Sequence, residues 1–183
     1  GSNGGDGAAT IRAAFARLCE VVFAGARLCE AVFAGTRSRE DVLAVTNPSS
    51  SAPEGARLSR IYRTRPLYVE DQPDFINAAA AGRTALEPRE LLAAVNRIEA
   101  EFGRDRSRER PKGPRSLDID ILLYGSLVLD EPGLVIPHPG LSERRFALAP
   151  LVDLEPLMTD PRSGASYAAI LDSLPDQGIY LLG

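Results

Sequence analysis

The sequence predicts an α+β sandwich of the split βαβ type, in which helices pack on a mainly antiparallel sheet. Residues 117–124 alternate between apolar and polar side chains with the period of a strand. Residues 88–102 instead carry apolar side chains at helical spacing. Clusters of Gly, Pro and Ser separate such segments, which indicates short turns between antiparallel neighbours.

The composition is typical of a globular domain. The 183 residues are 44% hydrophobic and 25% charged. A chain of this length can bury a hydrophobic core without disulfide bonds or a structural zinc ion. We expect one domain over residues 1–183. The formal net charge of −4 and the pI near 5.1 argue against a nucleic-acid-binding protein, whose surface would be basic.

Cysteine usage and hydropathy predict the compartment. Cys19 and Cys29 form neither a CxxC pair nor a Cys/His cluster, so no zinc site or disulfide framework is expected. Free cysteines in apolar segments suit a reducing compartment. The chain shows no signal peptide and no apolar run of about 20 residues. We therefore predict a cytoplasmic protein that does not enter a membrane.

The first predicted element is a helix over residues 10–34, which are rich in Ala and Leu. It contains a near-duplication, ARLCEVVFAG at 16–25 and ARLCEAVFAG at 26–35, which is too short for a repeat array. We interpret 16–35 as a duplicated helical segment that lengthens or breaks the first helix. The segment TNPSSSAPEGAR at 46–57 has the composition of a loop insertion.

Strands and helices alternate in the rest of the chain. Strands are predicted at 58–64 and 75–82. A helix begins at Pro88, a favoured first helical residue, and ends before Gly103, a favoured residue after a C-cap. The remaining predictions are a basic loop at 104–114, a strand at 115–124, a hairpin at 126–137, a helix within 138–151, a short helix at 166–174 and a terminal segment at 179–183.

Asp118 and Asp120 interrupt an otherwise apolar strand. Strand alternation places them on one face, about 7 Å apart along the chain. It groups Leu117, Ile119, Ile121 and Leu123 on one face and Asp118, Asp120, Leu122 and Tyr124 on the other. Isolated carboxylates are costly to bury, whereas two on one face can hold hard cations, which prefer oxygen ligands. An exposed strand face with two solvated acids is the simpler alternative.

The basic segment before these aspartates favours the metal site. Arginine forks bind phosphate well, and metal-binding acids beside phosphate-binding arginines are the components of phosphoryl transfer. His138, the only histidine, lies between two prolines and is either structural or a phosphate contact. Phe75 and Phe146 are core residues by default. The arginines before the aspartates are Arg104, Arg106, Arg110 and Arg115.

The ordered motifs resemble those of the 6-hydroxymethyl-7,8-dihydropterin pyrophosphokinase family of folate biosynthesis. Each motif is modest evidence alone, but the set follows the family's order over most of the chain. The matching segments are GSNGGD (1–6), YRTRPL (62–67), DQPDFINAA (71–79), IEAEFGRDR (98–106), GPRSLDIDILLYG (113–125) and IPHPGLSERRFALAPL (136–151).

The resemblance implies a ferredoxin-like α/β sandwich that transfers the pyrophosphoryl group of ATP to the pterin's hydroxymethyl oxygen, giving AMP and the pterin diphosphate. It implies two Mg²⁺ ions, with Asp118 and Asp120 as metal ligands. The implied catalytic residues are Arg104, Arg115, Asp118 and Asp120. The implied ATP-binding residues are Glu99, Arg106, Arg110, Ile121, His138 and Arg144. The implied pterin-binding residues are Thr64, Leu67, Phe75, Asn77 and Phe146, with the ring stacked between the two phenylalanines.

The chain departs from the family pattern at several places. Pro111 and Lys112 stand where the family commonly has an aromatic residue before GPR, and Arg65 replaces a commoner acid or proline. The family's first strand, normally just before GSN, is absent, and IYLLG at 179–183 resembles it. One hypothesis is that this terminal segment occupies the first-strand position after a rearrangement. The alternative is an ordinary tail.

Two other functions are alternatives to an active kinase. One is a catalytically weak pterin- or nucleotide-binding domain of a larger folate-pathway protein, which would bind ligand without turnover. The other is a DxD glycosyltransferase, which needs a sugar-nucleotide domain larger than this chain offers. The expected partners are ATP and the pterin, with the protein a monomer or fused to other folate enzymes.

Overall fold

The structure is a computed structural model that describes residues 7–23, 29–38, 55–65, 73–104 and 116–182. The helices are α1 (Gly7–Val21), α2 (Pro88–Glu101), α3 (Arg145–Leu154) and α4 (Tyr167–Ser173), with a 3₁₀ turn η1 (Leu141–Glu143). The strands are β1 (Cys29–Ser38), β2 (Arg57–Leu58), β3 (Tyr62–Thr64), β4 (Phe75–Thr84), β5 (Asp118–Tyr124), β6 (Leu129–Glu131), β7 (Leu134–Ile136) and β8 (Ile179–Leu181).

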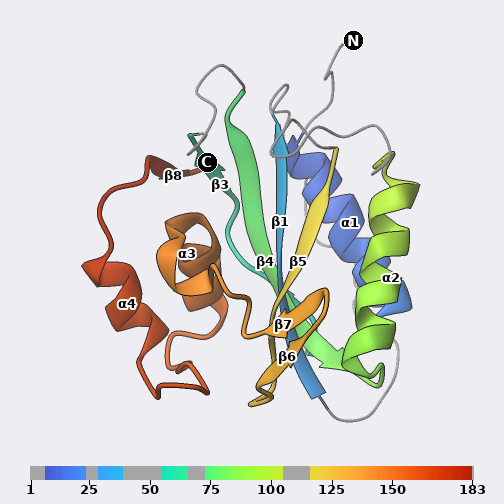
Figure 1. Cartoon of the computed structure of the whole chain (residues 1–183). Helices are drawn as coiled ribbons and strands as arrows, with labels where there is room; N and C mark the ends of the chain where they lie inside the picture. The colour runs from blue at the N-terminus through green and yellow to red at the C-terminus, as the bar shows by residue number, and fades with distance from the viewer. Residues whose placement is uncertain (1–6, 24–28, 39–54, 66–72, 105–115, 183) are drawn as a thin grey trace.

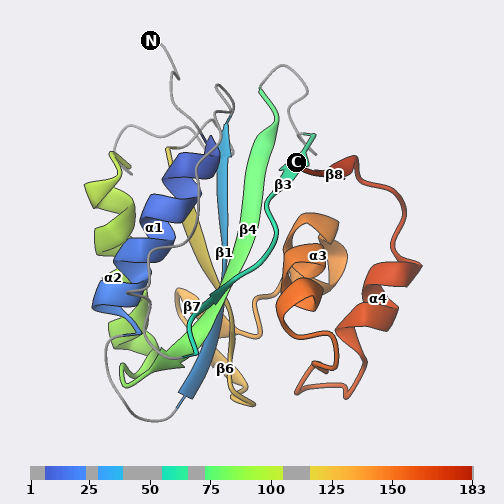
Figure 2. The ribbon, with the colours of Figure 1, turned by 180° about the vertical axis from the view of Figure 1, so that it is seen from behind.

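These elements form three layers, as Figure 1 shows and Figure 2 shows from behind. A sheet in the order β5-β1-β4-β3-β8 lies in the middle, with β2 also paired to β4. Helices α1 and α2 cover one face of this sheet, and α3 and α4 lie over the other. Its described strand pairs are antiparallel, so the predicted α+β sandwich with a mainly antiparallel sheet is confirmed. No described helix combines the length and apolar character needed to span a bilayer.

The two repeat copies adopt different structures, so the prediction of one helical segment over 16–35 is wrong. The first copy ends α1 at Val21, whereas the second contributes β1. β1 pairs with β4 along all 10 of its residues and with β5 on its other side. Ladder hydrogen bonds on both sides satisfy its backbone, and a helix here would leave both neighbouring strand edges unpaired.

Strand β4 is buried on both of its faces. Ile76, Ala78 and Ala80 pack with residues of the α1 layer, whereas Ala79 and Ala81 pack with residues of α3. The run of alanines lets helices on both faces lie close to the sheet. The predicted strand at 75–82 is confirmed and extends to Thr84. We call the sheet surface covered by α3 the α3 face.

Strand β5 contains a β-bulge that corrects the predicted alternation. The β1–β5 register pairs Phe33 with Ile121 but Val32 with Leu123, so Leu122 is an extra residue in β5. Leu117, Ile119 and Ile121 pack in the core beneath α1 and α2, as predicted. Beyond the bulge the pattern reverses: Leu123 packs with the α3 residues and Tyr124 with the α2 side. Asp118 and Asp120 precede the bulge and lie on the α3 face.

Helix α2 has the ends that the sequence predicts. Pro88 is its first residue, and Glu87 and Glu90 form a capping box at its start. Gly103 follows the C-cap with a φ of +84°, a conformation that favours glycine. The inward residues Leu91, Val95 and Ile98 are at most 1% exposed, and full burial of such side chains stabilises the fold by roughly 1.5–3 kcal/mol each.

Of the other predicted segments, the hairpin and the two later helices are confirmed, whereas the strand at 58–64 and the terminal segment differ from the prediction. The hairpin is β6–β7, and the helices at 138–151 and 166–174 are α3 and α4. The strand at 58–64 is split into β2 and β3. The terminal segment does join the sheet, but as the edge strand β8 beside β3, while β1 holds the place between β4 and β5. The hypothesis that this segment takes the first-strand position is not supported.

Candidate active site

One cross-strand row of the sheet brings the predicted metal and pterin residues onto a common face. Asp118 pairs with Thr36, Thr36 with Asn77, and Asn77 with Tyr62. Residues directly opposite each other in antiparallel strands share a face, here the α3 face. Because neighbouring strands lie about 4.8 Å apart, the backbones of Asp118 and Asn77 are separated by about 10 Å.

Asn77 is the buried polar centre of this row. It is 1% exposed, and its Nδ2 donates to Thr64 Oγ1 at 2.7 Å across the β3–β4 pair. Its Oδ1 is buried without a hydrogen-bond partner among the described residues. An unmade hydrogen bond at a buried acceptor costs about 1–3 kcal/mol. The Asn77 amide is therefore held with its carbonyl oxygen ready to accept from a ligand N–H.

Phe75 and Phe146 come from the two layers that meet at the α3 face, the sheet and helix α3. Phe75 belongs to the same face of β4 as Asn77, two residues away, and is half-buried. Phe146 lies in the first turn of α3 and packs partly against the α3-side core. The guanidinium carbon of Arg144 lies 5.9 Å from the centroid of the Phe146 ring, which orients both side chains.

Arg104 joins helix α2 to the aspartate strand. Its Nη1 donates to Glu99 Oε1 and to Asp118 Oδ1. The side chains are little exposed, at 8% for Arg104, 1% for Glu99 and 17% for Asp118. Glu99 Oε1 also accepts from the backbone N–H of Ile119 at 2.7 Å. The single arginine charge offsets part of the charge of the two carboxylates, and an unpaired buried charge is strongly unfavourable.

His138 is held by its own loop next to Asp118. Its backbone N–H donates to Leu122 O at 3.0 Å, which ties the loop to β5. Its Nδ1 accepts from the backbone N–H of Gly140 at 3.2 Å, which leaves the neutral ring with a proton on Nε2. Burial and the nearby charge of Arg144 lower the His138 pKa, and Asp118 partly opposes this. A neutral imidazole with Nε2–H can donate to a phosphate oxygen.

Several predicted site residues lie outside the described residues. These are Leu67, Arg106, Arg110 and Arg115, together with GSNGGD at 1–6, Pro111 and Lys112.

Two of the predicted ATP-binding residues are placed differently from the expectation. The Ile121 side chain is 5% exposed and packs in the core beneath α1 and α2, on the opposite face from Asp118. The Glu99 carboxylate is buried and bonded to Arg104 and β5. Direct contact of these two side chains with ATP is therefore not supported, because strand alternation and burial turn them away from the α3 face. Glu99 instead accepts from Arg104, which also donates to Asp118.

Asp118 and Asp120 fit a cation that is shared with a ligand. No group of three or more His, Cys, Asp or Glu side chains in the described part of the chain could build an all-protein cage. Mg²⁺ is usually bound by one or two carboxylates together with substrate phosphates and waters. Two partly exposed carboxylates on one strand face meet that need.

The comparisons with known proteins decide the family. A family model for 7,8-dihydro-6-hydroxymethylpterin-pyrophosphokinase (HPPK) matches residues 1–156. The chain belongs to the HPPK family. It is 43% identical over 122 residues to the 2-amino-4-hydroxy-6-hydroxymethyldihydropteridine pyrophosphokinase of Pseudomonas aeruginosa, a match that covers 67% of this chain and 74% of that protein.

Longer relatives match as well. The folic acid synthesis protein fol1 of Schizosaccharomyces pombe is 43% identical over 131 residues, which is 70% of this chain but only 18% of that protein. The chain thus spans a small part of some of its relatives. A crystal structure of an HPPK-DHPS protein in complex with substrates matches with a TM-score of 0.55 and 13% identity, over 79% of this chain and 43% of that chain. That likeness supports the fold.

The structure adds candidate residues that the sequence did not single out in this HPPK-family chain. The Ser116 hydroxyl, two residues before Asp118, is buried without a partner among the described residues. The hydroxyl of Tyr167, in the α3-side core, is likewise buried without a hydrogen-bond partner among the described residues. Asp153, near the end of α3, bonds Tyr62 of the cross-strand row. A sequence signal exists for Asp153 alone, because it lies seven residues after Phe146 and so on the same helix face.

Proposed function

We propose that the chain transfers the pyrophosphoryl group of ATP to 6-hydroxymethyl-7,8-dihydropterin in folate biosynthesis. The pterin's hydroxymethyl oxygen forms a bond to the β-phosphorus, and the bond from that phosphorus to the α,β-bridging oxygen breaks. The products are AMP and the pterin diphosphate, and the hydroxymethyl proton goes to solvent. The observation that carries this proposal is the shared row and face of Asp118 and Asn77.

The pterin would bind at the Asn77 end of the row. The Oδ1 of Asn77 accepts from a ring N–H, while its Nδ2 donates to Thr64 Oγ1. Phe75 and Phe146 offer faces for stacking on the flat heteroaromatic ring, an arrangement that aromatic pairs favour. The ring's hydroxymethyl arm then points along the sheet toward β5.

The triphosphate would bind at the Asp118 end. Arg104, His138 and Arg144 supply N–H donors there, and Asp118 and Asp120 would hold Mg²⁺, which neutralises charge on the transferring group when bound. Arg106, Arg110 and Arg115 are proposed to contact the phosphates as well. Catalysis of this kind depends mainly on positioning and electrostatic stabilisation, so no separate general base is required.

Several finer assignments belong to the same proposal. We infer two Mg²⁺ ions per site, one pyrophosphokinase domain over residues 1–183, and a cytoplasmic protein. Fusion to other folate enzymes is supported by the small fraction of fol1 that the chain spans and by the HPPK-DHPS structure. The same observations favour the second candidate, a catalytically weak pterin- or nucleotide-binding domain of a larger folate-pathway protein.

Formation of AMP distinguishes the two candidates. Purified, folded protein is incubated with ATP, Mg²⁺ and the hydroxymethyl-dihydropterin, and AMP is measured with a coupled assay. We expect AMP that depends on both the pterin and Mg²⁺. AMP no higher than in the pterin-free control, together with measurable pterin binding, would establish the binding domain instead.

A further inference from the structure

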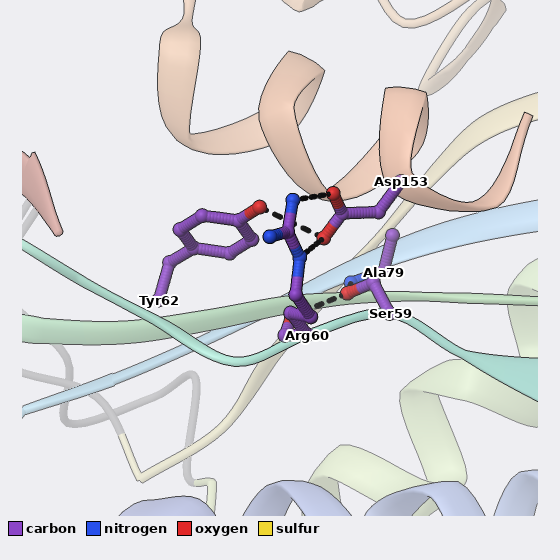
Figure 3. A network of polar contacts seen from close by, with 5 residues as sticks. All are labelled: Ser59, Arg60, Tyr62, Ala79 and Asp153. Atoms are coloured by element: carbon purple, nitrogen blue, oxygen red, sulfur yellow. Dashed lines mark hydrogen bonds and ion pairs between the residues drawn. The ribbon is translucent and has the colours of Figure 1, made fainter. Parts of the chain in front are cut away.

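A polar network joins β3 to the far end of helix α3 (Figure 3). The Asp153 carboxylate accepts from Arg60 Nε at 3.0 Å, from a second guanidinium nitrogen of Arg60, and from the Tyr62 hydroxyl at 2.8 Å. Beside it, the backbone N–H of Ala79 donates to Ser59 Oγ at 2.9 Å, which bonds the same segment to β4. We call Arg60, Tyr62 and Asp153 the β3–α3 clamp.

The clamp reaches the proposed pterin site through the sheet. Tyr62 is directly opposite Asn77 in the β3–β4 register and shares the α3 face with Thr64, two residues along the strand. Thr64 in turn accepts from Asn77 Nδ2. The residue that Asp153 holds is thus a direct neighbour of the two residues that orient the pterin's edge.

The clamp also acts, through helix α3, on the position of Phe146, the second proposed stacking residue. Phe146 and Asp153 are seven residues apart in α3, which is close to two full turns, so their side chains leave the same face of the helix. The rise between them is about 10 Å. A contact that fixes Asp153 against β3 therefore also fixes how far Phe146 lies from the sheet.

We propose that Asp153 is a positioning residue for the pterin. By holding Tyr62, it sets the distance between the Thr64–Asn77 pair on the sheet and Phe146 on α3. The inference rests on the proposed function of this site, and it assigns Asp153 no contact with substrate. A pocket that must stack a flat ring tolerates little variation in that distance, because a gap of 0.5–1 Å already loses much of the dispersion contact.

The burial of the clamp residues indicates that the clamp fixes the position of Tyr62 more than it stabilises the whole fold. The Arg60 side chain is 63% exposed, and exposed ion pairs contribute little to stability because solvent screens them. Tyr62 is 8% exposed, and burial with its bond to Asp153 raises its pKa to about 12, so its hydroxyl remains a donor at neutral pH. The Tyr62–Asp153 bond is the specific, water-shielded link.

A second link at the same helix end provides the matched control. Arg57 of β2 donates to Leu154 O at 2.9 Å and pairs with Glu155. These bonds join β2 to the end of α3, and neither of them involves Tyr62 or Asp153. Arg57→Gln therefore removes a polar link between sheet and α3 while the clamp remains.

The test compares Asp153→Ala, Tyr62→Phe and Arg57→Gln with the wild type. KM is measured separately for the pterin and for ATP. Pterin affinity is also measured by its own fluorescence, with Mg²⁺ and a non-hydrolysable ATP analogue present. For Asp153→Ala and Tyr62→Phe we expect pterin KM and Kd to rise about tenfold, with ATP KM and kcat within about twofold. Asp153→Asn, which keeps an acceptor for Tyr62, should recover most of the affinity, and Arg57→Gln should match the wild type.

Each outcome bears on the proposal. An unchanged pterin Kd in Tyr62→Phe, or equal losses for pterin and ATP, would overturn the positioning role. Equal losses in Arg57→Gln would do the same, because they would indicate a general loosening of α3. Tyr62→Phe removes one oxygen and keeps the packed ring, so it folds even if Asp153→Ala does not. Failure of the proposed catalysis would appear separately, as absent AMP formation in the wild type with pterin affinity still measurable.

Discussion

Thr64 and Asn77 form a cross-strand pair in which Asn77 Nδ2 donates to Thr64 Oγ1 at 2.7 Å. The other end of the amide, Asn77 Oδ1, is a buried acceptor without a partner among the described residues. A protein interior seldom keeps such an atom unless a ligand or water completes it. The pair is therefore a preorganised half of a hydrogen-bonding site.

Replacing Asn77 with leucine removes this acceptor while keeping a similar volume. We expect pterin KM to rise tenfold or more, which corresponds to about 1.4 kcal/mol or more, with ATP KM little changed. Steady-state kinetics with each substrate varied in turn measures this. Arg83→Ala, an exposed change on the same strand, is the control. Normal pterin KM in Asn77→Leu would place the pterin elsewhere.

Replacing Asp118 or Asp120 with alanine should abolish Mg²⁺-dependent turnover. The loss of a ligand to the cation removes charge stabilisation of the transferring group, which is worth about 100-fold or more in rate. Pterin stacking between Phe75 and Phe146 should persist, as fluorescence titration would show. Near-normal AMP formation in both variants would refute the metal assignment.

Arg104→Met should destabilise the fold, because it leaves Glu99 and Asp118 without their shared cation. Glu99 is 1% exposed, and removal of one partner from a buried ion pair costs about 3–5 kcal/mol. Urea denaturation measures the change. Arg17→Met removes an exposed arginine paired with Glu20 and Glu101, and it should cost much less because solvent screens exposed ion pairs. Similar losses in the two variants would contradict the burial argument.

Gly82→Ala should destabilise the protein through Phe23. A Cβ at Gly82 would lie 2.7 Å from a carbon of the Phe23 ring, closer than real contacts allow. Overpacking of this kind costs about 1–3 kcal/mol. Phe23→Leu, which replaces the ring with a smaller side chain, should restore part of the loss in the double variant, as thermal or urea unfolding would show. Strictly additive effects would mean that the two residues do not clash.

His138 should make stability fall as the pH is lowered. Burial first, and then Arg144, lowers its folded pKa below the ordinary 6.5, so the unfolded chain binds the proton more readily. The contribution of the neutral ring is complete above pH 6.5 and is lost as the pH falls through the lowered pKa. His138→Gln keeps an acceptor for the Gly140 N–H without titrating. Its stability relative to the wild type, measured without Mg²⁺, should therefore rise between pH 7 and 5, and parallel curves would contradict this assignment.

Local patterns in the sequence determined most elements and the chemistry of the site. Period-two alternation predicted β5 and placed Asp118 and Asp120 together on one face, since successive side chains of a strand point to opposite faces. The Pro88 start and Gly103 end of α2 follow equally from local backbone preferences. The motif resemblance named the metal, phosphate and pterin residues before any contact between them could be seen.

The tertiary structure decided what these patterns could not. ARLCEVVFAG ends a helix and ARLCEAVFAG supplies a central strand, although they differ only at Val21 and Ala31. The difference arises because the second copy lies between β4 and β5, whose backbone groups need partners on that side. The link from Asp153 to Tyr62 is likewise invisible in sequence, because it joins residues 91 positions apart. Contacts of that separation exist only once the sheet and α3 are packed together.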